Sequence, residues 1–202
     1  VWARAGASSF TRPPMYGHAI AQLLRAGVAV DDDAIERAEL GLRFLVEDRR
    51  RDASGLIEVV HPWETGCDDS PRWDHYCPGT GFDLERWRKY KGELLTSIDR
   101  GSAGEPISNS GFGAAPVSFS ALTAWNIREL ASVSGRHGLL SHAADLSDAV
   151  AARWDAERQT WIDAGPGAAT SGRLRTADAF TALLVVDDPQ QQAAAVAALS
   201  DV

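Results

Sequence analysis

The residues whose types and spacing could do chemistry lie between His61 and Asp74, a stretch that we call the acidic loop. It reads His-Pro-Trp-Glu-Thr-Gly-Cys-Asp-Asp-Ser-Pro-Arg-Trp-Asp, with four carboxylates and two tryptophans in fourteen residues. Pro62, Gly66 and Pro71 interrupt helices and strands alike, so turns must fix the backbone here. We therefore predict a shaped loop that aims polar side chains at a ligand.

Asp68 is the leading candidate for an acid in this loop. It follows four residues after Glu64, precedes Asp69, and lies between Trp63 and Trp73 in the sequence. Carboxylates crowded between apolar walls have a raised pKa, which brings a carboxyl group into the working range of a general acid. This spacing makes Asp68 the first candidate for acid catalysis.

The alternative is that the loop carboxylates only support the backbone, by accepting hydrogen bonds from exposed N–H groups. We favour this interpretation for Asp69 and Asp74, either of which could pair with Arg72. For Asp68 the spacing leaves both interpretations open.

The two tryptophans of the loop offer flat apolar faces beside polar groups. Such faces suit the C–H surface of a sugar ring, and they suit a protein core equally well. Trp73, at the edge of the loop, is predicted to be a core residue. Trp63, between Pro62 and Glu64, is predicted to be a platform for a ligand.

A metal site and a cysteine nucleophile are the less favoured interpretations. The potential ligands have neither the spacing of zinc motifs nor that of a calcium loop; they are His61, Glu64, Asp68, Asp69, Asp74 and His75. No histidine is placed by a motif to activate Cys67. We therefore predict no metal and no cofactor.

Composition narrows the class of protein. The chain has 202 residues, 45% of them hydrophobic, which is enough for a substantial core. A net charge of −8 argues against nucleic acid as a partner. No apolar run approaches the roughly 20 residues that span a bilayer, so no membrane partner is predicted.

Two further features of the sequence concern its setting. Cys67 and Cys77 could form a disulfide, but so few cysteines fit a reducing compartment better, and we expect a cytoplasmic protein. The chain starts at Val1 without an initiator methionine. We therefore expect it to be a piece of a longer protein.

Periodicity and helix-boundary signals predict about seven helices and no real sheet. The predicted helices span residues 13–30, 31–51, 83–99, 116–134, 139–154, 176–186 and 189–200. Short extended segments are predicted at 56–60 and 161–163, and residues 100–115 are predicted to be a long connection. Helix pairs joined in this way indicate a curved array of hairpins, either an α-solenoid or an α/α barrel.

The acidic loop resembles the signature of glycoside hydrolase family 63 and its trehalase relatives. The closest likeness is to the bacterial mannosylglycerate and glucosylglycerate hydrolases, whose loop reads Trp-Glu-Ser-Gly-x-Asp-Asn-Ser-Pro-Arg-Trp-Asp. Residues 11–14, Thr-Arg-Pro-Pro, resemble the Thr-Gln-Pro-Pro that opens a helix in that family, and residues 116–122 resemble a later inner helix. The likeness extends over roughly residues 8–186.

This resemblance implies an all-α fold, an (α/α)6 barrel, with residues 1–202 forming part of a single catalytic domain. It implies an inverting glycosidase that acts on an α-linked glucoside or mannoside, with a small carbohydrate as its substrate. Asp68 takes the position of the general acid. The general base is a glutamate on a separate loop, roughly 6.5–9.5 Å from the acid, and no matching segment is found before Val202.

The resemblance also places substrate-binding residues in the chain. Trp63 lines the sugar subsite, and Glu64 and Gly66 accompany it in the motif. Arg12 replaces the substrate-contacting glutamine, and its charged fork favours an anionic group or a carboxylate partner. The family arginine that recognises glycerate has no counterpart in residues 83–112, where the candidates are Arg86, Arg88 and Arg100.

Two alternatives stay open at this point. Sugar epimerases and polysaccharide lyases also use α/α barrels, so fold alone does not select hydrolysis. A non-catalytic half-barrel that binds sugar or another protein would fit the missing base. In either case an incomplete barrel exposes apolar helix faces, which a further part of the chain or a second copy would cover.

Overall fold

The computed structural model describes residues 11–77, 79, 81, 83–165 and 174–200, and this part of the chain is mostly helical. The α-helices are α1 (Tyr16–Arg25), α2 (Asp32–Arg43), α3 (Leu84–Leu94), α4 (Val117–Ser134), α5 (Leu140–Ala151) and α6 (Pro189–Ser200). A π-helix, η1 (Phe44–Asp48), extends α2, and the longest 3₁₀ helix is η5 (Ala177–Leu184). The strands are β1 (Ile98–Arg100), β2 (Pro106–Asn109), β3 (Trp154–Asp155) and β4 (Thr160–Trp161).

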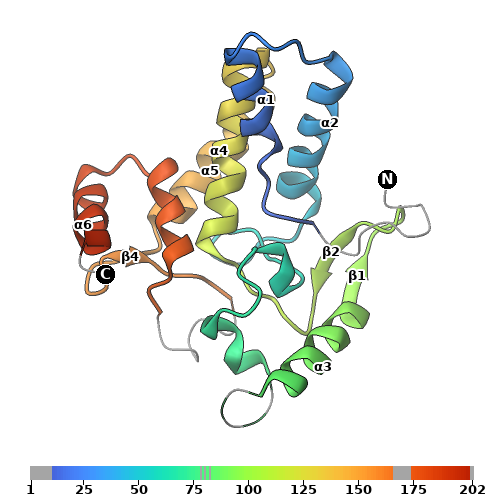
Figure 1. The fold of residues 1–202 in the computed structure, drawn as a ribbon, viewed down its shortest axis with the longest axis vertical. Coiled ribbons are helices and arrows are strands. Elements are labelled where there is room, and N and C mark those ends of the chain that lie inside the picture. Colours follow the sequence, from blue (N-terminus) through green and yellow to red (C-terminus); the bar gives the residue numbers. More distant parts are fainter. Residues whose placement is uncertain (1–10, 78, 80, 82, 166–173, 201–202) are drawn as a thin grey trace.

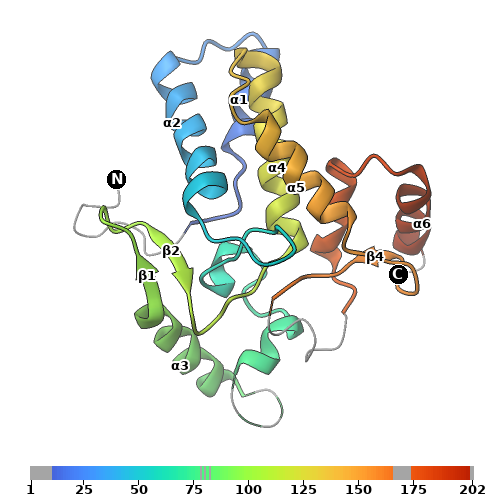
Figure 2. The same cartoon turned by 180° about the vertical axis from the view of Figure 1, so that it is seen from behind.

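Helices α1, α2, α4 and α5 lie side by side in one part of the molecule (Figure 1), and the opposite view shows the same grouping (Figure 2). Helix α3 lies beside the hairpin β1–β2, and α6 lies on the other side of the molecule. The acidic loop runs between these parts, so helices on several sides determine its shape.

Helix α4 is the centre of the core. Its residues are buried on most sides because α1, α5 and η5 all pack against it. The predicted boundaries are confirmed: Pro116 precedes the first turn, and Gly135 ends the helix at a positive φ of 69°. Glycine adopts this left-handed conformation without the steric penalty of a β-carbon.

Helices α1 and α2 begin in different ways. The Asp31 side chain accepts a hydrogen bond from Ala34 N–H and so caps α2, at the residue where the predicted helix 31–51 begins. No side chain of its own segment caps α1; instead Asn126 of α4 accepts from His18 N–H at 2.8 Å and donates to Pro14 O at 2.6 Å. A β-carbon at Gly17 would overlap the Asn126 backbone oxygen, so glycine permits this close crossing.

The prediction of no real sheet is wrong, because two short antiparallel hairpins are present. The helix predicted over 83–99 ends at Leu94, and a 3₁₀ turn, η4 (Leu95–Ser97), leads into β1. Strand β1 pairs with β2 from Ile98↔Asn109 to Arg100↔Pro106, so part of the predicted connection 100–115 forms the second strand. The helix predicted over 139–154 ends at Ala151, since Trp154 pairs with Trp161.

Single antiparallel bridges join the segments that lead into successive loops and helices. Val59 pairs with Ala114, and Ala115 pairs with Ala164. The segments before the acidic loop, before α4 and after β4 therefore run side by side. The extended segment predicted at 56–60 takes part in these contacts through Val59, and the segment predicted at 161–163 is extended at Trp161, which pairs with Trp154.

The helices follow one another as pairs: α1 with α2, α4 with α5, and η5 followed by α6. This agrees with an array of helical hairpins, while the complete (α/α)6 barrel and the extent of the domain stay predictions. Among the described residues, no helix combines the length and the apolar character needed to cross a membrane.

Candidate active site

The acidic loop is built from two 3₁₀ turns, η2 (Pro62–Glu64) and η3 (Pro71–Tyr76), each of which begins with a proline. Proline suits the first helical position, because its missing N–H would have no partner there. Gly66, between the two turns, has a φ of 73°, a conformation that side chains with a β-carbon rarely adopt. The prediction of a loop fixed by turns is confirmed.

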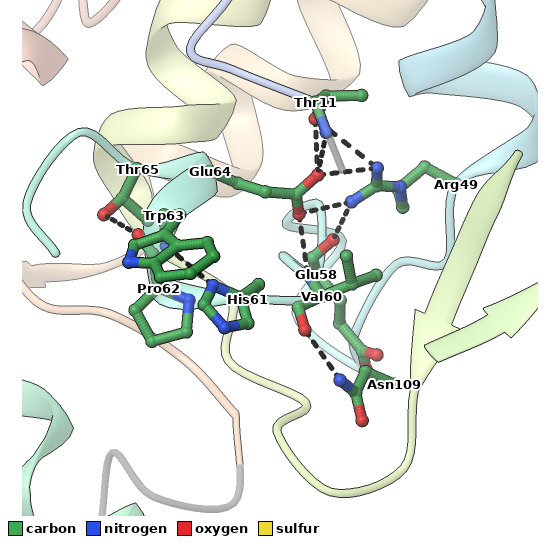
Figure 3. A network of polar contacts seen from close by, with 10 residues as sticks. All are labelled: Thr11, Arg49, Glu58, Val60, His61, Pro62, Trp63, Glu64, Thr65 and Asn109. Carbon is green, nitrogen blue, oxygen red and sulfur yellow. Dashed lines mark hydrogen bonds and ion pairs between the residues drawn. The ribbon is translucent and has the colours of Figure 1, made fainter. Parts of the chain in front are cut away.

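Within this loop, Glu64 forms an ion pair with Arg49, and both side chains are 0% exposed (Figure 3). Arg49 Nη1 donates to Glu64 Oε2 at 2.7 Å, and Nη2 donates to Oε1 at 2.9 Å. Thr11 donates to Oε1 through its backbone N–H and its hydroxyl, and Val60 N–H donates to Oε2. Both carboxylate oxygens are thus committed to protein donors.

Burial opposes the ionisation of Glu64, but the charge of Arg49 and the surrounding donors outweigh it. They hold the pKa of the Glu64 carboxyl below its ordinary value. The ionised pair joins three segments: the chain before α1, the end of the π-helix and the acidic loop. Glu64 therefore attaches the loop to the segment before α1 and to the end of the π-helix.

His61 and Asn109 attach the start of the loop to α3 and β2. His61 Nε2 donates to the backbone oxygen of Lys91 at 2.9 Å, and its Nδ1 accepts from Trp63 N–H. Burial lowers the pKa of His61, which agrees with the neutral imidazole that this pattern requires. Asn109 Nδ2 donates to Val60 O at 2.7 Å.

Asp69 is held by the side of α3 that faces the loop. Its Oδ1 accepts from Lys91 Nζ at 2.6 Å and from Trp87 Nε1 at 2.7 Å. These two donors lower the pKa of the Asp69 carboxyl, which stays ionised. The supporting role predicted for Asp69 is confirmed, but its partner is Lys91 and not Arg72.

Arg72 pairs with two carboxylates from distant parts of the chain. Its Nη1 donates to Asp163 Oδ2 at 3.0 Å, and its Nη2 donates to Asp178 Oδ2 at 2.8 Å. The pairing of Arg72 with Asp69 or Asp74 that we predicted is therefore wrong, because the fold brings two half-buried carboxylates to it. Asp74 lies at the exposed surface of η3.

Asp163 has a second role, since its Oδ1 accepts from the N–H of Val117 at the start of α4. Burial raises the pKa of Asp163 despite the nearby charge of Arg72. For Asp178 the balance is reversed: the charge of Arg72 and several hydrogen bonds outweigh burial and lower the pKa. One arginine thus joins the acidic loop to α4 and η5.

The predictions for the two tryptophans differ in outcome. Trp73 is 2% exposed, packs against Phe112 and donates from Nε1 to Cys67 O at 2.8 Å, so its core assignment is confirmed. Trp63 is half-buried, and its ring lies 4.4 Å from that of His61, between centroids. Its role as a sugar platform stays a prediction.

Asp68 lies at a cavity of about 550 Å³. The lining residues are Cys67–Pro71 from the acidic loop and Leu174–Asp178, which end the segment before η5 and begin η5 itself. Asp68 itself is half-buried. The cavity therefore brings the predicted acid beside a second segment, about 100 residues further along the chain.

Arg12 is placed elsewhere. It lines a separate cavity of about 720 Å³ between α1 and α2, whose other residues include Pro13, Tyr16 and Phe44. Pro13 lies 3.7 Å from the position that a β-carbon on Gly66 would take, so this segment touches the back of the acidic loop. Arg12 and Asp68 are not brought into one cavity by the described residues.

The other chemistries considered for the loop are a cysteine nucleophile, a disulfide and a metal site. Burial and nearby carboxylates raise the pKa of the Cys67 thiol, so it is a poor nucleophile near neutral pH. Cys67 and Cys77 are free thiols. Within the described ranges, no group of three or more His, Cys, Asp or Glu side chains is arranged to hold a metal ion.

Several residues of the site could not be predicted from the sequence. Arg49, Lys91 and Asp178 lie in ordinary helical or linking segments, and Arg175 carries no motif. Arg49 and Lys91 each lie among exposed residues, such as Asp48 and Arg50 or Gly92 and Glu93, so no local pattern marks either cation as buried. Their partners in the loop could not be identified without the fold.

The geometry described so far, a carboxylate-rich loop on paired helices, agrees with the family comparison. The chain belongs to the mannosylglycerate hydrolase MGH1-like glycoside hydrolase domain family, whose sequence model matches residues 2–202. It is therefore a domain of a glycoside hydrolase family, as the resemblance of the acidic loop implied.

Individual relatives align over shorter stretches. A glucosylglycerate hydrolase from Mycolicibacterium hassiacum is 36% identical over 78 residues, which is 33% of this chain and 18% of that protein. A mannosylglycerate hydrolase from Rubrobacter radiotolerans is 26% identical over 102 residues, which is 46% of this chain and 23% of that protein.

Solved structures show the same fold. A mannosylglycerate hydrolase of family GH63 from Thermus thermophilus, in complex with Tris and D-glycerate, superposes with a TM-score of 0.68 at 20% identity, covering 97% of this chain and 55% of that one. The complex of that hydrolase with glucose gives 0.67 at 24% identity, covering 96% and 52%. The chain thus spans about half the length of these solved relatives.

Proposed function

We propose that this chain forms part of an inverting glycoside hydrolase that acts on an α-linked glucoside or mannoside, with Asp68 as the general acid. Family membership favours hydrolysis over the epimerase and lyase reactions that other α/α barrels perform. The relatives named for glucosylglycerate and mannosylglycerate make these two compounds the first substrates to test.

The observation that carries the proposal is the different environment of the cavity carboxylates. Asp69 is paired with Lys91, and Asp178 is paired with Arg72. Within the described part of the chain, Asp68 lines the same cavity without an ion-pair partner. A carboxyl group that is not committed to a fixed cation is free to exchange a proton with a leaving oxygen.

The proposed reaction divides the work between two sides of the sugar. Asp68 protonates the glycosidic oxygen as the bond to the anomeric carbon breaks. A base on another part of the complete protein, whose carboxyl group lies roughly 6.5–9.5 Å from that of the acid, takes a proton from water on the opposite face of the sugar. The water oxygen then bonds to the anomeric carbon. Trp63 supplies an apolar surface for the sugar ring.

Substrate binding by Glu64, Gly66 and Arg12 stays part of the proposal, and the burial of Glu64 favours an indirect role for that residue. Glu64 is fully buried in its ion pair, and Gly66 provides the turn that places Asp68. Arg12 lies in the cavity between α1 and α2. Arg175 lines the Asp68 cavity and is exposed, so it is the cation that we propose for an anionic group of the substrate.

Asp68→Asn in the complete protein tests the proposal. We expect loss of hydrolysis by about 10²–10⁴-fold or more, with an unchanged melting temperature. Asp74→Asn is the matched control, because Asp74 is an exposed carboxylate of the same loop that does not line the cavity. Near-normal turnover by Asp68→Asn would overturn the proposal, and NMR of the first-formed anomer would test inversion.

A further inference from the structure

Lys91 is the cation that α3 presents to the acidic loop. Its side chain is only 8% exposed, although it carries a charge, while that of Asp69 is 61% exposed. Lys91 Nζ lies 2.6 Å from Asp69 Oδ1, and Trp87 Nε1 donates to the same oxygen. An ammonium group so deeply buried requires a compensating anion, which Asp69 provides.

The same lysine also contacts loop residues that precede Asp68 in the sequence. Its Nζ lies 5.9 Å from the ring centroid of Trp63 and 5.3 Å from that of Trp87, within the range of cation–π attraction. Its backbone oxygen accepts the hydrogen bond of His61 Nε2. Lys91 thus contacts residues that precede and follow Asp68 in the sequence.

The charge of Lys91 has a consequence for Asp68, because Asp68 and Asp69 are consecutive. Two neighbouring carboxylates oppose each other's ionisation when neither is compensated. Lys91 removes this interaction by neutralising Asp69, and the low exposure of its ammonium limits screening by solvent.

We propose that Lys91 is a positioning residue for the hydrolytic reaction, which neutralises Asp69 and holds the loop so that Asp68 faces the cavity beside a compensated neighbour. This inference rests on the proposed role of Asp68 as the general acid. Lys91 itself does not line the Asp68 cavity and is not proposed to touch the substrate.

Other charged groups near the loop do not replace Lys91. Those that act on a residue of the loop or line its cavity are His61, Arg72, Arg88, Asp163, Arg175 and Asp178. His61 is neutral in its hydrogen-bonding pattern, and Arg72 is committed to its two carboxylates. Arg88 and Arg175 are exposed, so solvent screens their charges.

Four variants of the complete protein test the charge pairing through the pH dependence of kcat/KM. The basic limb reports the general acid, because activity falls once that acid loses its proton. Lys91→Met leaves Asp69 uncompensated and should move the basic limb up by roughly half a unit to one unit. Asp69→Asn leaves Lys91 uncompensated and should move the limb down by a similar amount.

The double variant, Lys91→Met with Asp69→Asn, should return the basic limb close to its original position. Lys91→Arg should also preserve it, because the charge is kept. Lys89→Met is the matched control: Lys89 is a lysine of the same helix, 80% exposed and paired with Glu93 at 3.8 Å. Melting temperatures identify any variant that fails to fold.

A second readout is independent of turnover. The ¹³C resonance of the Asp68 carboxyl, followed by NMR, should titrate with the same opposite shifts in the single variants and the same cancellation in the double variant. Shifts seen by NMR while Asp68→Asn retains activity would uphold the pairing and overturn the proposed acid. Unchanged titration in Lys91→Met and Asp69→Asn would overturn the role of Lys91.

Discussion

Arg49 and Glu64 face each other through two hydrogen bonds of 2.7 and 2.9 Å in a position that solvent does not reach. Fifteen residues separate them in the chain, and Thr11 approaches the same carboxylate from the segment before α1. The pair therefore determines how the acidic loop is seated on the helices. The position of the loop also depends on both charges, because removing one partner would leave the other charge buried without compensation.

Arg49→Met is expected to destabilise the protein by about 3–5 kcal/mol, since it leaves the Glu64 carboxylate buried without its cation. Denaturant unfolding measures this loss. Arg50→Met is the matched control: Arg50 is the next residue, 61% exposed and paired with Glu58 at 3.3 Å. Its loss should cost no more than about 1 kcal/mol. Equal effects of both substitutions would contradict the structural role of the buried pair.

Acid should weaken the protein through Glu64. Because the folded-state pKa of Glu64 lies below its unfolded value, the stabilisation is present above the unfolded pKa of about 4.3 and is lost as the pH falls through the folded one. Urea unfolding at a series of pH values between neutral and acid should show this decline. In Glu64→Gln the decline should be shallower, and identical slopes would argue against the assignment.

Substitutions of Trp63 and of Trp73 should affect different properties: sugar binding for Trp63 and the stability of the fold for Trp73. Trp63→Ala is expected to weaken sugar binding by about tenfold, the factor that corresponds to about 1.4 kcal/mol, with little change in melting temperature. Trp73→Phe is expected to cost about 1–3 kcal/mol of stability, because Cys67 O loses its buried donor. Calorimetric titration with the sugar and thermal melting measure the two effects. Equal losses of both properties in Trp63→Ala would return Trp63 to the core.

The helices could be predicted from the sequence where local signals agree. Asp31 caps α2 and Gly135 ends α4 through interactions within a few residues, and apolar periodicity indicates which sides are buried. The hairpin β1–β2 could not be predicted in this way. Its strands are short, and their pairing depends on contacts such as Ser108 Oγ with Asp99 at 2.7 Å.

The site was only partly predictable, because its polar partners lie far apart in the sequence. The acidic loop and the importance of Asp68 follow from local composition and from the family motif. Arg72 is separated from Asp163 by 91 positions and from Asp178 by 106 positions, and no local pattern indicates either pairing. The same holds for Lys91, whose partner Asp69 lies 22 positions away.

Helix α1 has no side-chain cap in its own segment; Asn126, 108 positions from His18, accepts from His18 N–H and donates to Pro14 O instead. Helix formation in α1 is consequently coupled to docking on α4, whereas α2 carries its own cap in Asp31. Thr11 lies just before α1 and donates to Glu64. The conformation of the acidic loop therefore depends on the docking of distant helices, and not on the sequence of the loop alone.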